Sequence, residues 1–365
     1  MKNKLLEPFY DPEKTYEENY TEGPFGAFAD GDVFEQIGEP NYDFMGQKVF
    51  LPFGIPAGPL LNGHFIKAAF DKGFDIAVYK TVRTKKYACN PWPNVLAVKI
   101  EGKLTPEKGA EGLVADHTYT QPLAVTNSFG VPSFDPDVWQ PDMKKAINNA
   151  RPGQVVVGSF QGTTNATGDI EAYIQDFANA AKLVKETGAK ILEVNLSCPN
   201  EGTAHLLCFD IERTQRVVEA IKQEIGETPL IIKVAYYKKQ EELIKLLDAV
   251  GKSVQGIAAI NTIPSKIIDA KGNQALPGKG RAISGVCGAP IQWAGVEMVE
   301  RLKKLREEND LSYSIIGVGG VTYPQDYQKF RDAGADAVMS ATGAMWNPYL
   351  AQEIKKQHSS LRETK

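Results

Sequence analysis

The chain contains 365 residues, of which 42% are hydrophobic and 24% are charged, and its formal net charge is −4. This composition is typical of a globular protein with a sizeable core, and it lacks the basic stripe of a nucleic-acid-binding surface. The N-terminus has no signal-peptide pattern, no apolar run is long enough to cross a membrane, and the four cysteines (Cys89, Cys198, Cys208 and Cys287) fit neither a zinc ribbon nor a disulfide framework. We therefore expect a cytoplasmic protein with free thiols, without a membrane span and without nucleic acid as a partner.

In chain order, residues 1–45 come first and form a polar, aromatic N-terminal extension of undetermined structure. Residues 46–365 are expected to be one catalytic domain, because no linker divides them. Eight apolar runs in this domain predict strands, and most are continuous rather than alternating, which is typical of parallel strands covered on both faces. These runs are 53–57, 75–81, 155–160, 191–197, 230–235, 255–262, 314–318 and 336–340.

Helical patterns alternate with the predicted strands. The clearest is 168–187, in which Ile170, Ile174 and Phe177 recur at helical spacing and Gly188 provides a C-terminal cap. Eight strand–helix alternations predict an α/β fold of the (β/α)8 TIM barrel type, which typically needs ~250 residues. A doubly wound sheet is the alternative, but no GxGxxG turn follows the first strand. The other predicted helices are 64–72, 141–150, 211–225, 239–250, 291–308, 324–333 and 348–357.

One long segment does not belong to the repeat. Residues 89–140 are rich in Pro, Asn and Gly and precede the third predicted strand. Long loops inside compact domains are often functional, so we expect an insertion there that influences the site.

Polar or small residues follow most of the predicted strands. Because the carboxyl ends of barrel strands meet at one mouth, these residues are expected to converge on an active site. They are Pro56-Ala57-Gly58, Lys80-Thr81, Asn195 to Asn200, Lys233, Asn261-Thr262, Gly319-Gly320 and Ala341-Thr342-Gly343.

The segment Asn195-Leu196-Ser197-Cys198-Pro199-Asn200 is the most informative of these. A thiol with an ordinary pKa of about 8.5 can act as a base near neutral pH, although free cysteines are also common as small buried apolar residues. A cysteine–histidine pair is disfavoured, because none of the four histidines follows a predicted strand, and no ligand cluster indicates a metal site.

Lysines and glycines complete the candidate site. Lys80 and Lys233 end apolar strands, where a lysine either pairs with a carboxylate or faces an anionic ligand. Lys233 could alternatively form a Schiff base, as in an aldolase. The glycine turns after the seventh and eighth strands favour phosphate binding, with Ser284-Gly285 as a further small-residue loop. The basic cluster Arg83, Lys85 and Lys86 is interpreted as a solvated loop or a weak anion attractor.

On these residues the chain resembles the dihydroorotate dehydrogenases, FMN-dependent enzymes of pyrimidine synthesis. The NLSCPN segment resembles most closely the soluble, cysteine-type class 1, and the similarity runs from about residue 48 to about residue 355. Asn127-Ser128-Phe129-Gly130-Val131-Pro132 matches the NSxGxP loop of the family. The chain departs from the family pattern in its N-terminal extension, in its longer segment before Asn127, and at Ser133 and Ala341.

The resemblance implies the roles of the site residues. Cys198 would remove a proton from C5 of dihydroorotate while the hydride of C6 passes to N5 of FMN. Lys80 would be catalytic together with Cys198 and would serve both substrate and flavin, and Lys233 would lie beside the N1–O2 edge of the flavin. The residues expected to bind substrate are Lys80, Asn127, Asn195, Asn200, Asn261 and Thr262. Those expected to bind FMN are Ala57, Gly58, Lys80, Thr81, Asn195, Lys233, Ser284, Gly285, Gly319, Gly320, Ala341 and Thr342.

The resemblance also implies a homodimer and an electron acceptor, for which fumarate, a quinone and NAD through an iron–sulfur partner remain open. Three other hypotheses remain at this point. The first is a flavin enzyme for another dihydropyrimidine such as dihydrouracil, and Asn200 argues against it. The second is the aldolase that uses Lys233, and the third is a catalytically silent scaffold.

Overall fold

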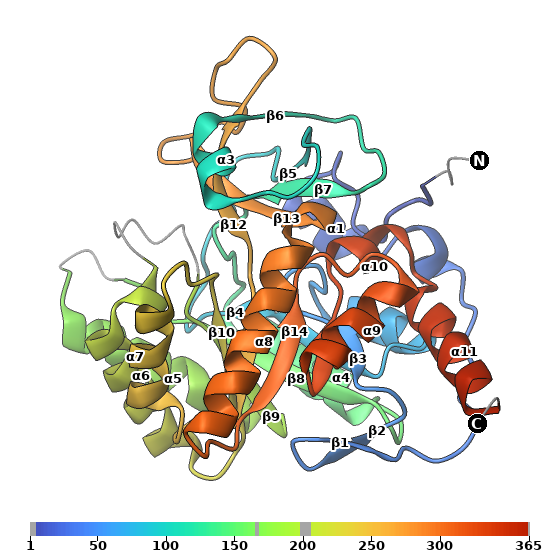
Figure 1. Ribbon diagram of the computed structural model, residues 1–365, viewed down its shortest axis with the longest axis vertical. Helices are drawn as coiled ribbons and strands as arrows, with labels where there is room; N and C mark the ends of the chain where they lie inside the picture. Colours follow the sequence, from blue (N-terminus) through green and yellow to red (C-terminus); the bar gives the residue numbers. More distant parts are fainter. Residues whose placement is uncertain (1–4, 165–167, 198–205, 364–365) are drawn as a thin grey trace.

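The computed structural model describes residues 5–164, 168–197 and 206–363 (Figure 1). Two predicted site residues, Cys198 and Asn200, lie outside this range. The division of the chain at residue 45 stays a prediction, and an antiparallel hairpin of β1 (Tyr42–Phe44) and β2 (Gln47–Val49) spans it.

Eight parallel strands form a closed barrel, as predicted from the apolar runs. The strands pair in the order in which they occur in the chain, and the last, β15, closes the ring by pairing with the first, β3. Their side chains are buried almost throughout, which explains why the sequence shows continuous apolar runs. The strands are β3 (Phe53–Ile55), β4 (Ile76–Val82), β8 (Val155–Phe160), β9 (Ile191–Asn195), β10 (Leu230–Val234), β11 (Gly256–Ala259), β14 (Ser314–Val318) and β15 (Ala337–Met339).

Helices follow the strands and cover the outside of the barrel (Figure 1). Most of their bounds lie within two residues of the predicted ones, but α4 begins at Pro136 rather than at residue 141. The early start is favoured by proline in the first turn and by Trp139, which is buried and donates from Nε1 to the carbonyl of Arg83 at 3.2 Å. The helices are α2 (Gly63–Asp71), α4 (Pro136–Asn148), α5 (Ile170–Glu186), α6 (Ile211–Ile225), α7 (Gln240–Val250), α8 (Gln292–Glu308), α9 (Pro324–Ala333), α10 (Thr342–Trp346) and α11 (Leu350–Glu363).

The hairpin β1–β2 plugs the amino-terminal end of the barrel. Phe44 and Val49 are buried and join the apolar cluster that fills the barrel interior, together with Ile76, Ile231 and Ile316. Burying a side chain of this size contributes roughly 1.5–3 kcal/mol. The opposite end, where the strands terminate, therefore forms the mouth of the barrel.

A second, smaller closed sheet of five strands stands above that mouth (Figure 1). The insertion supplies β5 (Val95–Val98), α3 (Pro106–Glu111), β6 (Leu113–Asp116) and β7 (Ala124–Asn127), and the segment after β11 supplies β12 (Ile263–Ile268) and β13 (Ile283–Gly288). We did not predict these strands. They are short, and they pair across segments that are far apart in the chain, so their pairing cannot be predicted from the local sequence.

The N-terminal extension packs against the barrel beside this sheet. It contains α1 (Tyr16–Glu22), which begins at a capping box formed by Thr15 and Glu18, and the short helix η1 (Gly26–Ala29). Phe9 donates its N–H to the carbonyl of Met345 at 3.1 Å, and Lys72 pairs with Asp30 at 2.5 Å. The extension thus contacts Lys72, near the start of the barrel domain in the chain, and Met345, near its end.

Candidate active site

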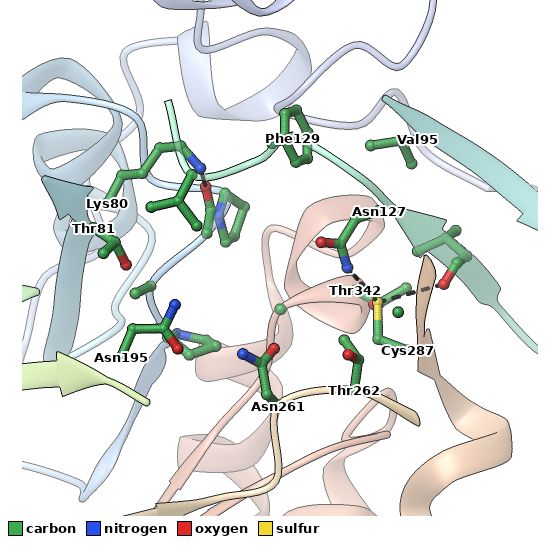
Figure 2. A pocket seen from close by; sticks show the side chains of 18 of the residues that line it. Lys80, Thr81, Val95, Asn127, Phe129, Asn195, Asn261, Thr262, Cys287 and Thr342 are labelled. Atoms are coloured by element: carbon green, nitrogen blue, oxygen red, sulfur yellow. Dashed lines mark hydrogen bonds between the residues drawn. The ribbon is translucent and has the colours of Figure 1, made fainter. Parts of the chain in front are cut away.

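The mouth of the barrel contains a hollow of about 1140 Å³, counting the space open to solvent (Figure 2). Its wall includes predicted site residues from all parts of the chain, which confirms that the strand ends converge. These are Ala57, Gly58, Lys80, Thr81, Asn127, Asn195, Lys233, Asn261, Thr262, Gly285, Ala341 and Thr342.

Among the described residues, three that were predicted for the site do not line the hollow. Ser284 donates its hydroxyl to the carbonyl of Asn127 at 2.9 Å, so its side chain holds β7 beside β13. Gly319 and Gly320 follow Val318, which does line the hollow. Gly320 has a φ of +77°, and a Cβ there would lie 2.7 Å from the backbone nitrogen of Gln292, so this turn requires glycine.

The carboxamides on the floor are oriented by hydrogen bonds. Asn195 donates from Nδ2 to Oε1 of Gln161 at 2.8 Å and accepts at Oδ1 from the hydroxyl of Ser197 at 3.2 Å. Asn261 donates from Nδ2 to the same Ser197 hydroxyl at 2.9 Å. Ser197, which directly precedes Cys198 in the chain, is therefore fixed between two residues of the pocket wall.

Two buried ionisable residues, Glu193 and Lys233, lie at or next to this floor. Glu193 is fully buried on β9, and Lys233 follows on the neighbouring strand β10 with 6% of its surface exposed. Burial raises the pKa of Glu193 and lowers the pKa of Lys233, and the attraction between the two groups opposes both shifts. Glu193 also accepts from Ser159 at 3.4 Å, and the Ser159 hydroxyl lies 2.9 Å from that of Thr81 in the pocket wall.

Lys80 reaches the hollow from β4 and is mostly enclosed. Its ammonium donates to the carbonyl of Gly58 at 3.3 Å and lies 5.0 Å from the ring centroid of Phe129 and 5.6 Å from that of Tyr16. A cation at this position suits an anionic ligand in the hollow.

Cys287 lines the pocket, although it is not among the predicted site residues. Its sulfur accepts from Thr342 Oγ1 at 3.3 Å and from Asn127 Nδ2 at 3.6 Å, and it donates to the carbonyl of Val125 at 3.5 Å (Figure 2). Burial raises the pKa of this thiol, which favours the neutral form that these contacts need. Its place two residues after Gly285, on the same strand face, was the signal in the sequence.

Two buried arginines brace the loop Asn127–Pro132. Arg281 donates to the hydroxyl and the carbonyl of Ser128, both at 3.0 Å. Arg83 donates to the carbonyls of Val131 at 2.9 Å and Gly162 at 2.7 Å. The interpretation of Arg83 as part of a solvated or anion-attracting cluster was therefore wrong, because the residue is 2% exposed and its guanidinium is bonded to backbone carbonyls.

The turn after β14 is fixed by a carboxylate. Asp326 accepts from the backbone N–H groups of Thr322 at 3.0 Å and Tyr323 at 2.9 Å. Burial alone raises the pKa of Asp326, but these hydrogen bonds outweigh it, and the pKa lies below its usual value. The loop that follows Gly319-Gly320 is thereby held in one conformation.

Two absences hold for the described ranges. Residues 5–164, 168–197 and 206–363 contain no group of three or more His, Cys, Asp or Glu side chains arranged to hold a metal. The helices within them include none that is both long and apolar enough to cross a membrane.

Comparisons with known proteins agree with the resemblance seen in the sequence. The family model described as dihydroorotate dehydrogenase matches residues 41–361. A dihydroorotate dehydrogenase of Dictyostelium discoideum is 34% identical over 97% of this chain and 98% of its own length, so that it shares most of the N-terminal extension.

More distant relatives differ in the acceptor that their names state. A dihydroorotate dehydrogenase (quinone) of Arthrobacter sp. is 27% identical over 84% of this chain and 81% of its own. The catalytic subunit of a dihydroorotate dehydrogenase B (NAD(+)) of Thermodesulfovibrio yellowstonii is 26% identical over 68% and 76%. A ligand-free structure from Eimeria tenella has a TM-score of 0.71 at 19% identity, covers 93% of this chain and 91% of that one, and shows the same fold.

Proposed function

We propose that this chain, which belongs to the dihydroorotate dehydrogenase family and is an oxidoreductase of pyrimidine biosynthesis that oxidises dihydroorotate, works with FMN bound in the mouth of the barrel. The family is flavin-dependent. The observation that carries the proposal is the convergence of Lys80, Asn127, Asn195 and Asn261 on one hollow above the buried Lys233.

The hollow fits a flavin in its chemistry. Lys233 places a buried cation at the floor, which suits the N1–O2 edge of a flavin, where negative charge gathers on reduction. Gly58 has a φ of +142° and open space where a Cβ would lie, so the backbone is accessible to a flat ring. When bound, FMN accepts the hydride that leaves C6 of the substrate.

The phosphate end is proposed to lie between two turns. Thr342 and Ala341 line the hollow, and the turn at Gly319-Gly320 is adjacent. Ala341 replaces a common glycine of the family, but its backbone N–H remains available as a donor. Gly285 completes this side, where a Cβ would lie 2.3 Å from the Thr262 hydroxyl.

The substrate ring is proposed to be bound by neutral amides and one lysine. Asn127, Asn195 and Asn261 offer donors and acceptors to the edges of a pyrimidine, with Thr262 beside them, and Lys80 faces its carboxylate. A site whose polar groups pair only with the right substrate rejects analogues by large factors. Asn200 is assigned to this set by the resemblance alone.

Cys198 is proposed as the base that removes the proton from C5. Support comes from Ser197, whose hydroxyl is bonded to both Asn195 and Asn261, and which Cys198 follows directly. The thiol must lose its own proton first, so the rate should rise with pH through the thiol pKa.

The test begins with the purified protein loaded with FMN. It should be yellow and should bleach under anaerobic dihydroorotate, but not under dihydrouracil. Cys198→Ser should slow bleaching at neutral pH by at least a hundredfold and recover as pH rises, because an alcohol is a poorer base. Equal rates for both proteins across pH would remove Cys198 from this role.

Membership of an oxidoreductase family argues against the aldolase hypothesis, which requires a borohydride-trapped adduct on Lys233. The electron acceptor is to be identified by screening fumarate, quinones and NAD with a partner subunit. We further propose a homodimer in the cytoplasm, to be tested by sedimentation and by localisation of a tagged chain.

A further inference from the structure

The N-terminal extension contributes an aromatic ring to the environment of Lys80. The Lys80 ammonium lies 5.6 Å from the centroid of Tyr16, which belongs to α1, and 5.0 Å from that of Phe129, which belongs to the loop Asn127–Pro132. Lys80 is 6% exposed and Tyr16 is 4% exposed. The extension therefore touches a predicted catalytic side chain rather than only covering the outside of the barrel.

The Tyr16 ring is held firmly in place. Thr15 caps the helix that carries it, and Asn19, one turn further on, is fully buried and bonded through its side chain to both backbone groups of Asp11 at 2.8 and 2.9 Å. Asn62 of the barrel donates to the carbonyl of Tyr20 at 2.8 Å. These contacts fix the start and the middle of α1 and so hold the backbone of Tyr16 next to Lys80.

The rings around Lys80 also support one another. Phe129 makes edge contacts with Tyr16, at 6.2 Å between centroids, and with Tyr10, at 5.6 Å. Tyr10 lines the same hollow. Aromatic edge contacts of this kind favour one orientation of both rings. Tyr10 and Tyr16 of the extension therefore help to position the Phe129 ring in the loop Asn127–Pro132, which we call the substrate loop.

We propose that Tyr16 is a positioning residue of the substrate site and that the N-terminal extension acts to hold Lys80 in place. A lysine free to rotate loses rotamer entropy when it binds a ligand, whereas one already held between two rings loses less. The inference rests on the proposed function, because it assigns the Lys80 ammonium to the anionic substrate.

A partly desolvated cation–π contact is strong enough to change binding by several-fold to about thirtyfold. Tyr16→Leu keeps an apolar side chain and removes the ring. In the full-length, FMN-loaded protein it should raise the KM for dihydroorotate, and the Kd for orotate measured from the flavin absorbance, each by about tenfold. The kcat at saturation should change by less than about threefold, and Tyr16→Phe should recover most of the lost affinity.

The matched control is another aromatic residue of the extension that faces a buried lysine. Phe34 lies 5.7 Å from the ammonium of Lys355, which also pairs with Asp75 at 2.7 Å, and none of these residues lines the hollow at the barrel mouth. Phe34→Leu should lower thermal stability as Tyr16→Leu does, but should leave both the KM and the orotate Kd unchanged.

A double-mutant cycle with Lys80→Met separates positioning from general packing. In the Lys80→Met protein, Tyr16→Leu should have no further effect on the orotate Kd. The inference is overturned if Tyr16→Leu matches Phe34→Leu in KM and Kd, or if its effect persists in full without Lys80. If Tyr16→Leu does not fold, Tyr16→Met, which is also apolar and lacks the ring, is measured in its place against the same criteria.

These experiments distinguish a failure of the proposed function from a failure of the positioning role of Tyr16. If dihydroorotate does not bleach the wild-type flavin, the proposed function of the chain is wrong. If Lys80→Met leaves substrate affinity unchanged, the proposed role of Lys80 in binding substrate is wrong. If the wild type and Lys80→Met behave as proposed and only the Tyr16 variants do not, the positioning role alone is wrong.

Discussion

Replacing Arg281 by methionine is expected to destabilise the protein by about 2–4 kcal/mol, because the guanidinium bonds several backbone groups that have few other partners. Arg281 is 3% exposed and donates to the carbonyls of Pro277 at 2.5 Å, Pro91 at 2.7 Å and Pro93 at 2.9 Å, and to Ser128 twice. In the described part of the chain, the carbonyls of Pro93 and Pro277 accept no other hydrogen bond.

The magnitude follows from opposing contributions. Each buried carbonyl left without a partner costs about 1–3 kcal/mol, which gives about 2–6 kcal/mol for two. The variant regains part of this, because a buried guanidinium is itself poorly solvated, as the lowered pKa of Arg281 indicates. The net loss should exceed what one surface ion pair contributes, which is about 0–1 kcal/mol.

The assay is urea unfolding of Arg281→Met beside Lys279→Met, which changes an exposed residue of the same loop. Because Ser128 adjoins Asn127, the Arg281 variant should also raise the KM for dihydroorotate several-fold, whereas Lys279→Met should change neither quantity. A stability loss below about 1 kcal/mol, or an unaltered KM, would refute the view that Arg281 braces the substrate loop.

Three further predictions concern the turn after β14, the barrel wall and the floor. Asp326→Asn should lose about 1–2 kcal/mol of stability. The pKa of Asp326 in the folded protein lies below its ordinary value of 3.8. The difference in urea midpoint between the variant and the wild type should therefore be constant above pH 3.8 and should shrink as the pH falls below 3.8. Gly54→Ala would place a Cβ 2.1 Å from the carbonyl oxygen of Ile76 and should cost more than about 3 kcal/mol, whereas Gly31→Ala, in open space at φ +81°, should cost about 1 kcal/mol in thermal unfolding. Lys233→Met should release FMN at least about tenfold more readily in ultrafiltration, since the floor then lacks its cation; unchanged retention would place that lysine away from the flavin.

The barrel could be predicted from the sequence because its strands are buried on both faces. Runs such as Leu230–Val234 are apolar without interruption, and the polar residues that follow them are ordered by the closure of the sheet. Once the alternation of strands and helices is counted, convergence at one mouth follows without further information.

The sheet above the mouth could not be predicted in the same way. In β12, buried and exposed positions alternate, and the strand begins directly after the site residues Asn261 and Thr262. Its partners are β13 and β6, of which β6 comes from the insertion. Pairing of this kind is decided by tertiary contact and leaves no local signal.

Among the site residues, the sequence marked those at barrel strand ends, and the resemblance added Asn127 and Gly285 of the small sheet, but two residues that approach from elsewhere were missed. Cys287 lies in the small sheet and Tyr16 in the extension, so neither follows a barrel strand. Arg83 looked exposed because it adjoins Lys85 and Lys86, which are exposed. Whether a basic side chain bonds carbonyls or water depends on the packing of distant loops, which here are the loops at Val131 and Gly162.

The pairing of β7 with β13 has a consequence for engineering. Asn127 stands opposite Gly285, and Thr126 opposite Val286. The insertion, which supplies β7, and the segment after β11, which supplies β13, are therefore paired in one register. Adding a single residue to either segment would turn its side chains to the other face of the strand. Grafting a loop from a relative onto this enzyme should therefore succeed only when the insertion and the segment after β11 are exchanged as a pair.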